Sequence, residues 1–111
     1  SYPVATVVAE KFEALVRLDF QNSRMKDFFD LDFLLAQALP DREELEEAIA
    51  ATFRRRGTDL PDTEPAGLSD AFVEDKQVMW EAFLSKSGLE PRDFGQIVKL
   101  IREGTAWIWT R

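Results

Sequence analysis

The sequence contains neither cysteine nor histidine. Without cysteine, the chain has no disulfide bonds and no thiolate metal site. Without histidine, it lacks the side chain that most often serves as a general base and as a metal ligand. Any metal bound by this chain would therefore be a hard cation held by carboxylates.

The sequence also lacks a long apolar run and an excess of basic residues. No apolar stretch is long enough to span a membrane, so we expect no membrane association. The net charge of −7 is spread along all 111 residues, which argues against nonspecific binding to a nucleic-acid backbone. The composition is 45% hydrophobic and 12% aromatic, which is typical of one folded globular domain.

The hydrophobic periodicity predicts helices and no convincing strand. The predicted helices run from Pro3 or Val4 to Leu18, from an N-cap at Asn22 or Ser23 to about Leu39, from an N-cap at Asp41 to Arg56, from about Glu74 to Ser87, and from near Pro91 to Gly104. Residues 57–66 are predicted to form a loop, and residues 68–72 a short turn or helix. Residues 107–109 either form a short extended segment or prolong the last helix. The predicted fold is therefore all-α, a single compact domain of about five helices.

Lys11 lies in the middle of the apolar face of the first predicted helix. At about 100° per residue, one arc of this helix contains Lys11 together with Val4, Val7, Ala14, Leu15 and Leu18. The opposite, polar arc contains Thr6, Glu10, Glu13 and Arg17. A buried ammonium group is costly unless an anion contacts it, so Lys11 either contacts an anion or snorkels to solvent. Methionine in its place is expected to leave stability unchanged.

The second predicted helix has apolar residues on nearly all sides, which is typical of a central or partner-covered helix. Its narrow polar arc carries Lys26, Asp27, Asp30 and Gln37. Asp27 and Asp30 are neighbours at i,i+3 and would repel unless a cation lies between them. Lys11 and Arg24 are the candidate cations.

One apparent metal motif, Asp30-Leu31-Asp32, can be rejected as a shared metal site. Two aspartates separated by one residue face the same way on a strand, but on a helix they point about 200° apart. We expect Asp32 to contact a basic partner where two helices meet.

Two segments carry a family resemblance. Residues 10–16 read Glu-Lys-Phe-Glu-Ala-Leu-Val, and residues 22–31 read Asn-Ser-Arg-Met-Lys-Asp-Phe-Phe-Asp-Leu. Together they resemble the Glu-Lys helix, short spacer and Arg-x-(Arg/Lys)-Asp-aromatic-aromatic-Asp-Leu pattern of the AbiEii/AbiGii nucleotidyltransferase toxins of type IV (abortive-infection) toxin–antitoxin systems. Weaker matches at residues 2–4, 68–72 and 80–84 extend the resemblance over most of the chain.

The resemblance implies a polymerase-β-like nucleotidyltransferase core ahead of this region, with a Gly-Ser turn and a magnesium-binding Asp-x-Asp strand. Residues 1–111 contain no Gly-Ser pair and no strand-borne Asp-x-Asp. We therefore expect residues 1–111 to be the helical C-terminal part of a larger nucleotidyltransferase, inactive alone. Mg²⁺ and a nucleoside triphosphate are expected only in the complete enzyme. The implied partners are that missing nucleotidyltransferase half, an antitoxin and an RNA acceptor, in the bacterial cytoplasm.

The resemblance also implies roles for five residues. Lys11 matches the family lysine that contacts the nucleotide triphosphate. Arg24 matches a basic position that pairs with an aspartate or with phosphate, and Lys26 is its less secure neighbour. Asp27 and Asp30 match an aspartate pair, one of which orients the lysine or acts as a base near the acceptor hydroxyl. The expected catalytic residues are thus Asp27 and Asp30, and no metal ligand is expected.

An alternative interpretation assigns no chemistry to these residues. In this interpretation Asp27 and Asp30 only form bonds to Lys11, Arg24 or Lys26, as part of a network between helices. The chain would be a stand-alone helical protein-interaction module or a degenerate family member. Residues 54–56, three consecutive arginines, are predicted as a helix-end charge cluster, with a nucleic-acid contact as the alternative. Core or interface packing is predicted for the three tryptophans, Trp80, Trp107 and Trp109.

Overall fold

The computed structural model describes residues 3–37 and 41–111. Its α-helices are α1 (Val4–Leu18), α2 (Met25–Ala36), α3 (Arg42–Arg56), α4 (Asp70–Lys86) and α5 (Phe94–Thr105), and its short 3₁₀ helices are η1 (Asp19–Gln21), η2 (Ala66–Leu68) and η3 (Ala106–Ile108). These described ranges contain no strand. The predicted all-α domain of about five helices is confirmed. None of the helices seen is long and apolar enough to cross a lipid bilayer.

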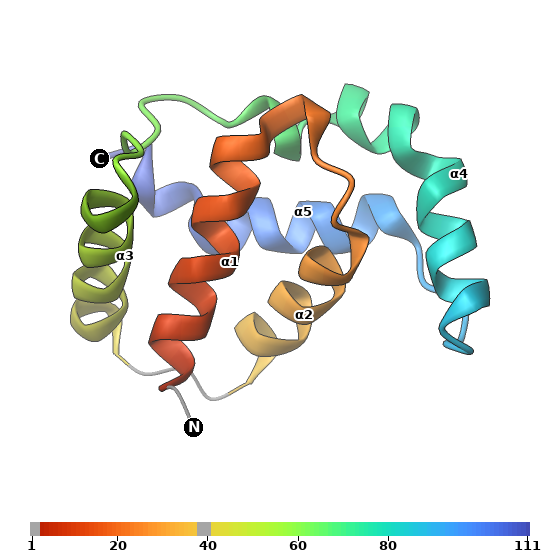
Figure 1. Ribbon diagram of the computed structural model, residues 1–111, viewed down its shortest axis with the longest axis horizontal. Coiled ribbons are helices and arrows are strands. Elements are labelled where there is room, and N and C mark those ends of the chain that lie inside the picture. The colour runs from red at the N-terminus through yellow and green to blue at the C-terminus, as the bar shows by residue number, and fades with distance from the viewer. Residues whose placement is uncertain (1–2, 38–40) are drawn as a thin grey trace.

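The helices form two crossed layers (Figure 1). In the front layer, α1 packs between α3 on one side and α2 on the other. Behind them, α5 crosses the molecule and packs against α2 and α4. The front surface of α1 is therefore flanked by a helix on each side, and this position makes it the floor of the candidate site.

Aromatic side chains fill the centre of the core. Phe28, Phe72, Phe94 and Trp80 have no exposed surface. The rings of Trp80 and Phe94 stack with centroids 4.6 Å apart, and Phe28 meets Phe94 edge-on at 5.5 Å. The indole Nε1 of Trp80 donates a 2.8 Å hydrogen bond to the carbonyl of Arg92, which satisfies its one polar group. Core packing is therefore confirmed for Trp80.

Side-chain caps set several helix ends. Asp41 Oδ1 accepts a 2.9 Å hydrogen bond from the amide of Glu44, and α3 ends at Gly57, whose φ of 68° suits glycine. Both features were predicted. The hydroxyl of Ser69 caps α4, so α4 begins earlier than the predicted start at Glu74. Asp93 caps α5, so that helix begins after Pro91.

Three predictions about helix ends were wrong or cannot be examined. Neither Asn22 nor Ser23 is the N-cap of α2, because Asn22 Oδ1 accepts a 2.9 Å bond from the amide of Arg24 and α2 starts one residue later. Gly104 does not interrupt α5, which continues to Thr105 before η3 prolongs the helical path. The predicted end of α2 near Leu39 and Pro40 lies outside the described residues.

Candidate functional site

Lys11 lies between the two aspartates of α2. Its Nζ is 3.1 Å from Asp27 Oδ1 and 3.2 Å from Asp30 Oδ2. The Asp27 side chain is only 8% exposed, and that of Lys11 is 22% exposed. Lys11 therefore has its anionic partners on the next helix. The predicted apolar arc that contains it is not the core face of α1, because Val4 is 41% exposed and the buried apolar side chains are those of Ala5, Val8, Ala9, Phe12, Ala14 and Leu15.

Two more cations from the start of α2 complete this cluster. Arg24 Nε lies 2.8 Å from Asp27 Oδ2, and Lys26 Nζ lies 2.7 Å from Asp30 Oδ2. The five residues that the family resemblance singled out thus form one network of three cations and two carboxylates. Lys26 stands at its edge, with a side chain that is 74% exposed.

The network shifts the pKa values of two of its members. Partial burial alone would lower the pKa of Lys11, but its hydrogen bonds to Asp27 and Asp30 outweigh burial and raise that pKa. Burial alone would raise the pKa of Asp30, but its bonds to Lys26 and Lys11 lower it. At neutral pH the Lys11 ammonium and the Asp30 carboxylate are therefore both charged.

A groove of about 650 Å³ opens along α1 beside this network. Its lining consists of Thr6, Val7, Glu10, Lys11, Ala14, Arg17, Arg24, Arg55 and Arg56. Five of these side chains are basic and one is acidic, in a chain whose net charge is −7. The groove therefore gathers basic side chains from α1, α3 and the start of α2, although each of them is paired with a carboxylate: Lys11 and Arg24 with Asp27, Arg17 with Glu13, and Arg55 and Arg56 with Glu10. Of the predicted nucleotide-binding residues, Lys11 and Arg24 line it, and Lys26 is not among the lining residues.

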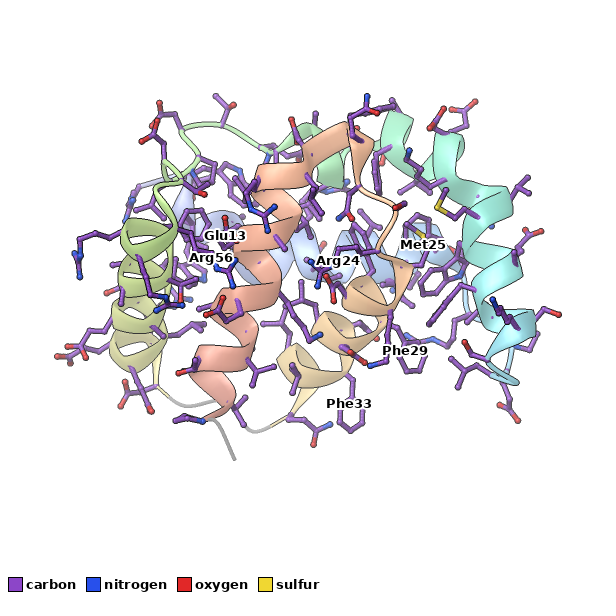
Figure 2. The ribbon with its side chains drawn as sticks, viewed as in Figure 1. Glu13, Arg24, Met25, Phe29, Phe33 and Arg56 are labelled. Atoms are coloured by element: carbon purple, nitrogen blue, oxygen red, sulfur yellow. The ribbon has the colours of Figure 1, made fainter. Side chains whose placement is uncertain are left out.

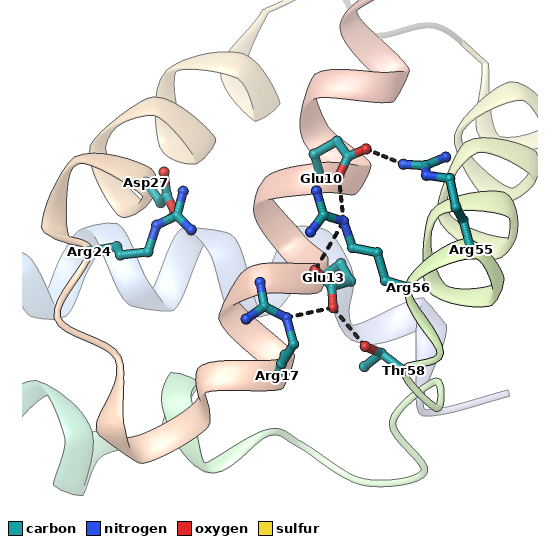
Figure 3. Close-up of polar contacts among 8 residues, drawn as sticks. All are labelled: Glu10, Glu13, Arg17, Arg24, Asp27, Arg55, Arg56 and Thr58. Carbon is teal, nitrogen blue, oxygen red and sulfur yellow. Dashed lines mark hydrogen bonds and ion pairs between the residues drawn. The ribbon is translucent and has the colours of Figure 1, made fainter.

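Glu13 is a second buried carboxylate beside the groove, and its position differs from the predicted polar arc of α1. It has no exposed surface, because the neighbouring α3 covers this side of α1. Its Oε2 accepts hydrogen bonds from Arg17 Nε at 2.9 Å and from Thr58 Oγ1 at 2.7 Å, and its Oε1 is 3.7 Å from Arg56 Nε (Figure 3). Burial opposes ionisation of Glu13, but the bonds from Thr58 and Arg17 prevail and lower its pKa.

Two of the three arginines at the end of α3 turn toward α1. Arg55 and Arg56 both donate to the carboxylate of Glu10, the latter from Nε at 3.0 Å (Figure 3). Arg54 is exposed. Residues 55 and 56 are thus more than a helix-end charge cluster, because they form one wall of the groove. One feature of the sequence could have predicted these ion pairs. Glu10 and Glu13 are i,i+3 neighbours on α1, and consecutive arginines end α3, the helix that packs against α1.

The carboxylates do not suit a magnesium ion. Asp27 is already bound by Lys11 and Arg24, and Asp30 by Lys11 and Lys26. Within residues 3–37 and 41–111, no group of three or more acidic side chains is placed to hold a metal. Asp32 pairs instead with Arg92 at 2.8 Å, so the predicted basic partner is confirmed, but Arg92 lies in the loop between α4 and α5 and not at a contact between two helices.

Comparison with known proteins agrees with the pattern of residues 10–31. Residues 1–100 match the family model of the nucleotidyl transferase AbiEii toxin of type IV toxin–antitoxin systems. The chain therefore belongs to the AbiEii nucleotidyltransferase toxin family. No curated protein and no solved structure gave a match.

Proposed function

We propose that the groove along α1 binds the triphosphate of a nucleotide, and that this domain is the nucleotide-contacting helical part of a nucleotidyltransferase toxin. The observation that carries the proposal is the gathering of five basic side chains around one groove in an acidic chain. Arginine forks match phosphate oxygens in pairs, and a lysine supplies a compact positive charge. The groove also has apolar lining from Val7 and Ala14, against which a sugar or base can rest.

Within this proposal the five network residues have different roles. Lys11 and Arg24 contact phosphate, because both line the groove. Asp27 and Asp30 are positioning residues that hold the Lys11 ammonium at the groove. The lowered pKa of Asp30 makes it a weak proton acceptor, which favours positioning over general-base catalysis. Lys26 supports Asp30 from the exposed edge.

The transfer reaction needs more than these residues. We propose that a nucleotidyltransferase half bearing the Gly-Ser turn and the Asp-x-Asp strand completes the enzyme, and that residues 1–111 alone do not transfer nucleotides. The described carboxylates support this division, because Asp27 and Asp30 are committed to cationic side chains. An antitoxin and an RNA acceptor are the proposed partners of the complete toxin.

A helical interaction module is the second candidate function, and one observation favours it. The Phe33 side chain on α2 is 59% exposed and projects from the molecule (Figure 2). Close by along the chain, Leu35 and Ala36 line a second groove of about 170 Å³ with Leu100 of α5. Phe33 does not line this groove, but Phe33 and one wall of the groove both belong to α2, and exposed apolar surface on one helix is what a partner protein would cover.

Titration of the protein with each nucleoside triphosphate, followed by amide NMR shifts, tests the first candidate. We expect shifts confined to the groove around Lys11 and Arg24, weakened in Lys11→Met and unchanged in Lys99→Met. Lys99 is an exposed lysine on α5, away from the groove-lining residues, and serves as the matched control. An absence of shifts at millimolar ligand, or shifts that survive Lys11→Met intact, would contradict the proposal.

A further inference from the structure

Glu10 is the one acidic side chain among the residues that line the basic groove. Its carboxylate holds both arginines of the α3 wall, Arg55 and Arg56. The pairs are solvent-accessible: the exposed fractions are 31% for Glu10, 57% for Arg55 and 46% for Arg56. Glu10 thus sits where an incoming anion would bind these arginines.

Arg56 lies between two carboxylates of unequal burial. Its Nε is 3.0 Å from the accessible Glu10 and 3.7 Å from the buried Glu13. Glu13 is itself fixed by Arg17 and Thr58 (Figure 3). When Glu10 moves away, Arg56 therefore keeps a counter-ion that holds it beside the groove.

We infer that Glu10 is a specificity-determining residue, an internal competitor that occupies Arg55 and Arg56 until a polyphosphate displaces it. This inference rests on the proposed phosphate-binding function. Exposed ion pairs are individually weak, so a ligand with several phosphates can replace Glu10 while it contacts the other cations of the groove. A single phosphate makes too few contacts to offset the lost pairs. Glu10 thereby sets a charge threshold that favours triphosphates over monophosphates.

The test is calorimetric titration with inorganic tripolyphosphate and with orthophosphate. We expect Glu10→Gln to bind tripolyphosphate about threefold to tenfold tighter than the unmodified protein, since two exposed ion pairs no longer oppose binding. Orthophosphate binding is expected to become measurable only in Glu10→Gln. Glu47→Gln removes the same charge from an exposed position of α3 outside the groove, and is expected to leave the affinity unchanged.

A second comparison separates local competition from a general change of charge. In an Arg55→Gln/Arg56→Gln background, Glu10→Gln is expected to give no gain in affinity, because its competitor role needs those arginines. Circular dichroism confirms that each variant is folded. Two outcomes would overturn the inference while the proposed function stands, provided that the unmodified protein binds tripolyphosphate. In the first, Glu10→Gln does not tighten binding. In the second, Glu10→Gln still tightens binding in the double-arginine background. If no variant binds tripolyphosphate, the proposed function fails with the inference.

Discussion

Lys11 Nζ on α1 lies 3.1 Å from Asp27 Oδ1 on α2, while the other oxygen of the same carboxylate is 2.8 Å from Arg24 Nε. Asp27 therefore pairs with two cations in a site where water has little access. Asp30 meets Lys11 and Lys26 but is more exposed, at 25% of its side chain. The two aspartates share one lysine and should nevertheless differ in their contributions to stability.

We predict that Asp27→Asn destabilises the fold more than Asp30→Asn. Loss of the buried charge leaves Lys11 and Arg24 without their common partner, at a cost of about 1–3 kcal/mol. The Asp30 pairs are more exposed, so Asp30→Asn should cost less than about 1 kcal/mol. Urea unfolding followed by circular dichroism measures both values. Equal losses for the two variants would show that burial does not distinguish these carboxylates.

Lys11→Met is expected to lower the free energy of unfolding by about 1–2 kcal/mol, because Asp27 keeps only Arg24 as a partner. The apolar arc of α1 on its own predicted no loss. Lys99→Met, which changes an exposed lysine on α5, should stay within about 0.5 kcal/mol of the unmodified protein. If Lys11→Met matches this control in urea unfolding, the Asp27 pair contributes nothing and the prediction from the sequence is the better one.

Local signals in the sequence predicted the helices well where a cap or a period is strong. Asp41 three residues before Glu44, and Gly57 after the arginines, placed both ends of α3. The start of α4 was predicted too late in the sequence. Residues 68–72 were assigned to a separate short turn or helix, so Ser69 was not considered as the N-cap of α4. Asn22 looks like a cap, but its side chain closes a turn instead. Competing local hydrogen bonds of this kind cannot be ranked from the sequence alone.

Only part of the site was predictable from the sequence, because some of its residues are brought together by contacts between helices. Lys11 stood out because a charge interrupted an apolar arc, and that argument led to Asp27 and Asp30. Glu13 interrupted nothing, since it belonged to the polar arc of α1. Its burial arises where α3 packs against α1, although Arg17 of the same arc stays 41% exposed, and the contact between the two helices is a tertiary feature that no local pattern encodes. The pairing of Arg56 with carboxylates of α1 was not predicted for the same reason.

Two glycines offer a matched pair of substitutions. A Cβ at Gly67 would lie 3.0 Å from the backbone oxygen of Asp19, whose side chain also accepts the Gly67 amide at 2.8 Å. Gly67→Ala should therefore destabilise the contact between η1 and η2. Gly95 lies in α5, and a Cβ there would meet Asp93 and Val73 only at ordinary distances.

Gly95 is the second residue of α5, so Gly95→Ala should stabilise the protein, by less than the gain of about 0.5–1 kcal/mol that alanine gives in a helix interior. Gly67→Ala should lower the melting temperature, and Gly95→Ala should raise it. Thermal unfolding by circular dichroism decides the signs. A stabilising Gly67→Ala would mean that the backbone near Asp19 moves aside without cost.

The lowered pKa values of Glu13 and Asp30 predict loss of stability in acid. Their ordinary values are 4.5 and 3.8, and each is lower in the folded protein. The unfolded chain therefore binds more protons over this range, so the stabilisation is complete above about pH 5 and is lost as the pH falls through the folded pKa values. Lys11 has the opposite pH dependence. Its pKa is raised in the folded protein, so its contribution to stability is complete at neutral pH and is lost as the pH rises above about 10.

Glu13→Gln separates the contribution of Glu13 from that of Asp30. The introduced amide would still accept a bond from Thr58 but would leave Arg17 and Arg56 without their buried counter-charge, so we expect a loss of about 1–3 kcal/mol near neutral pH. Because glutamine does not titrate, the free energy of unfolding should also fall less in the variant than in the unmodified protein between about pH 5 and pH 3. Urea midpoints measured across this range test both effects. A variant with the full acid-induced loss would place the titrating group elsewhere and reject Glu13 as the buried anchor of the groove arginines.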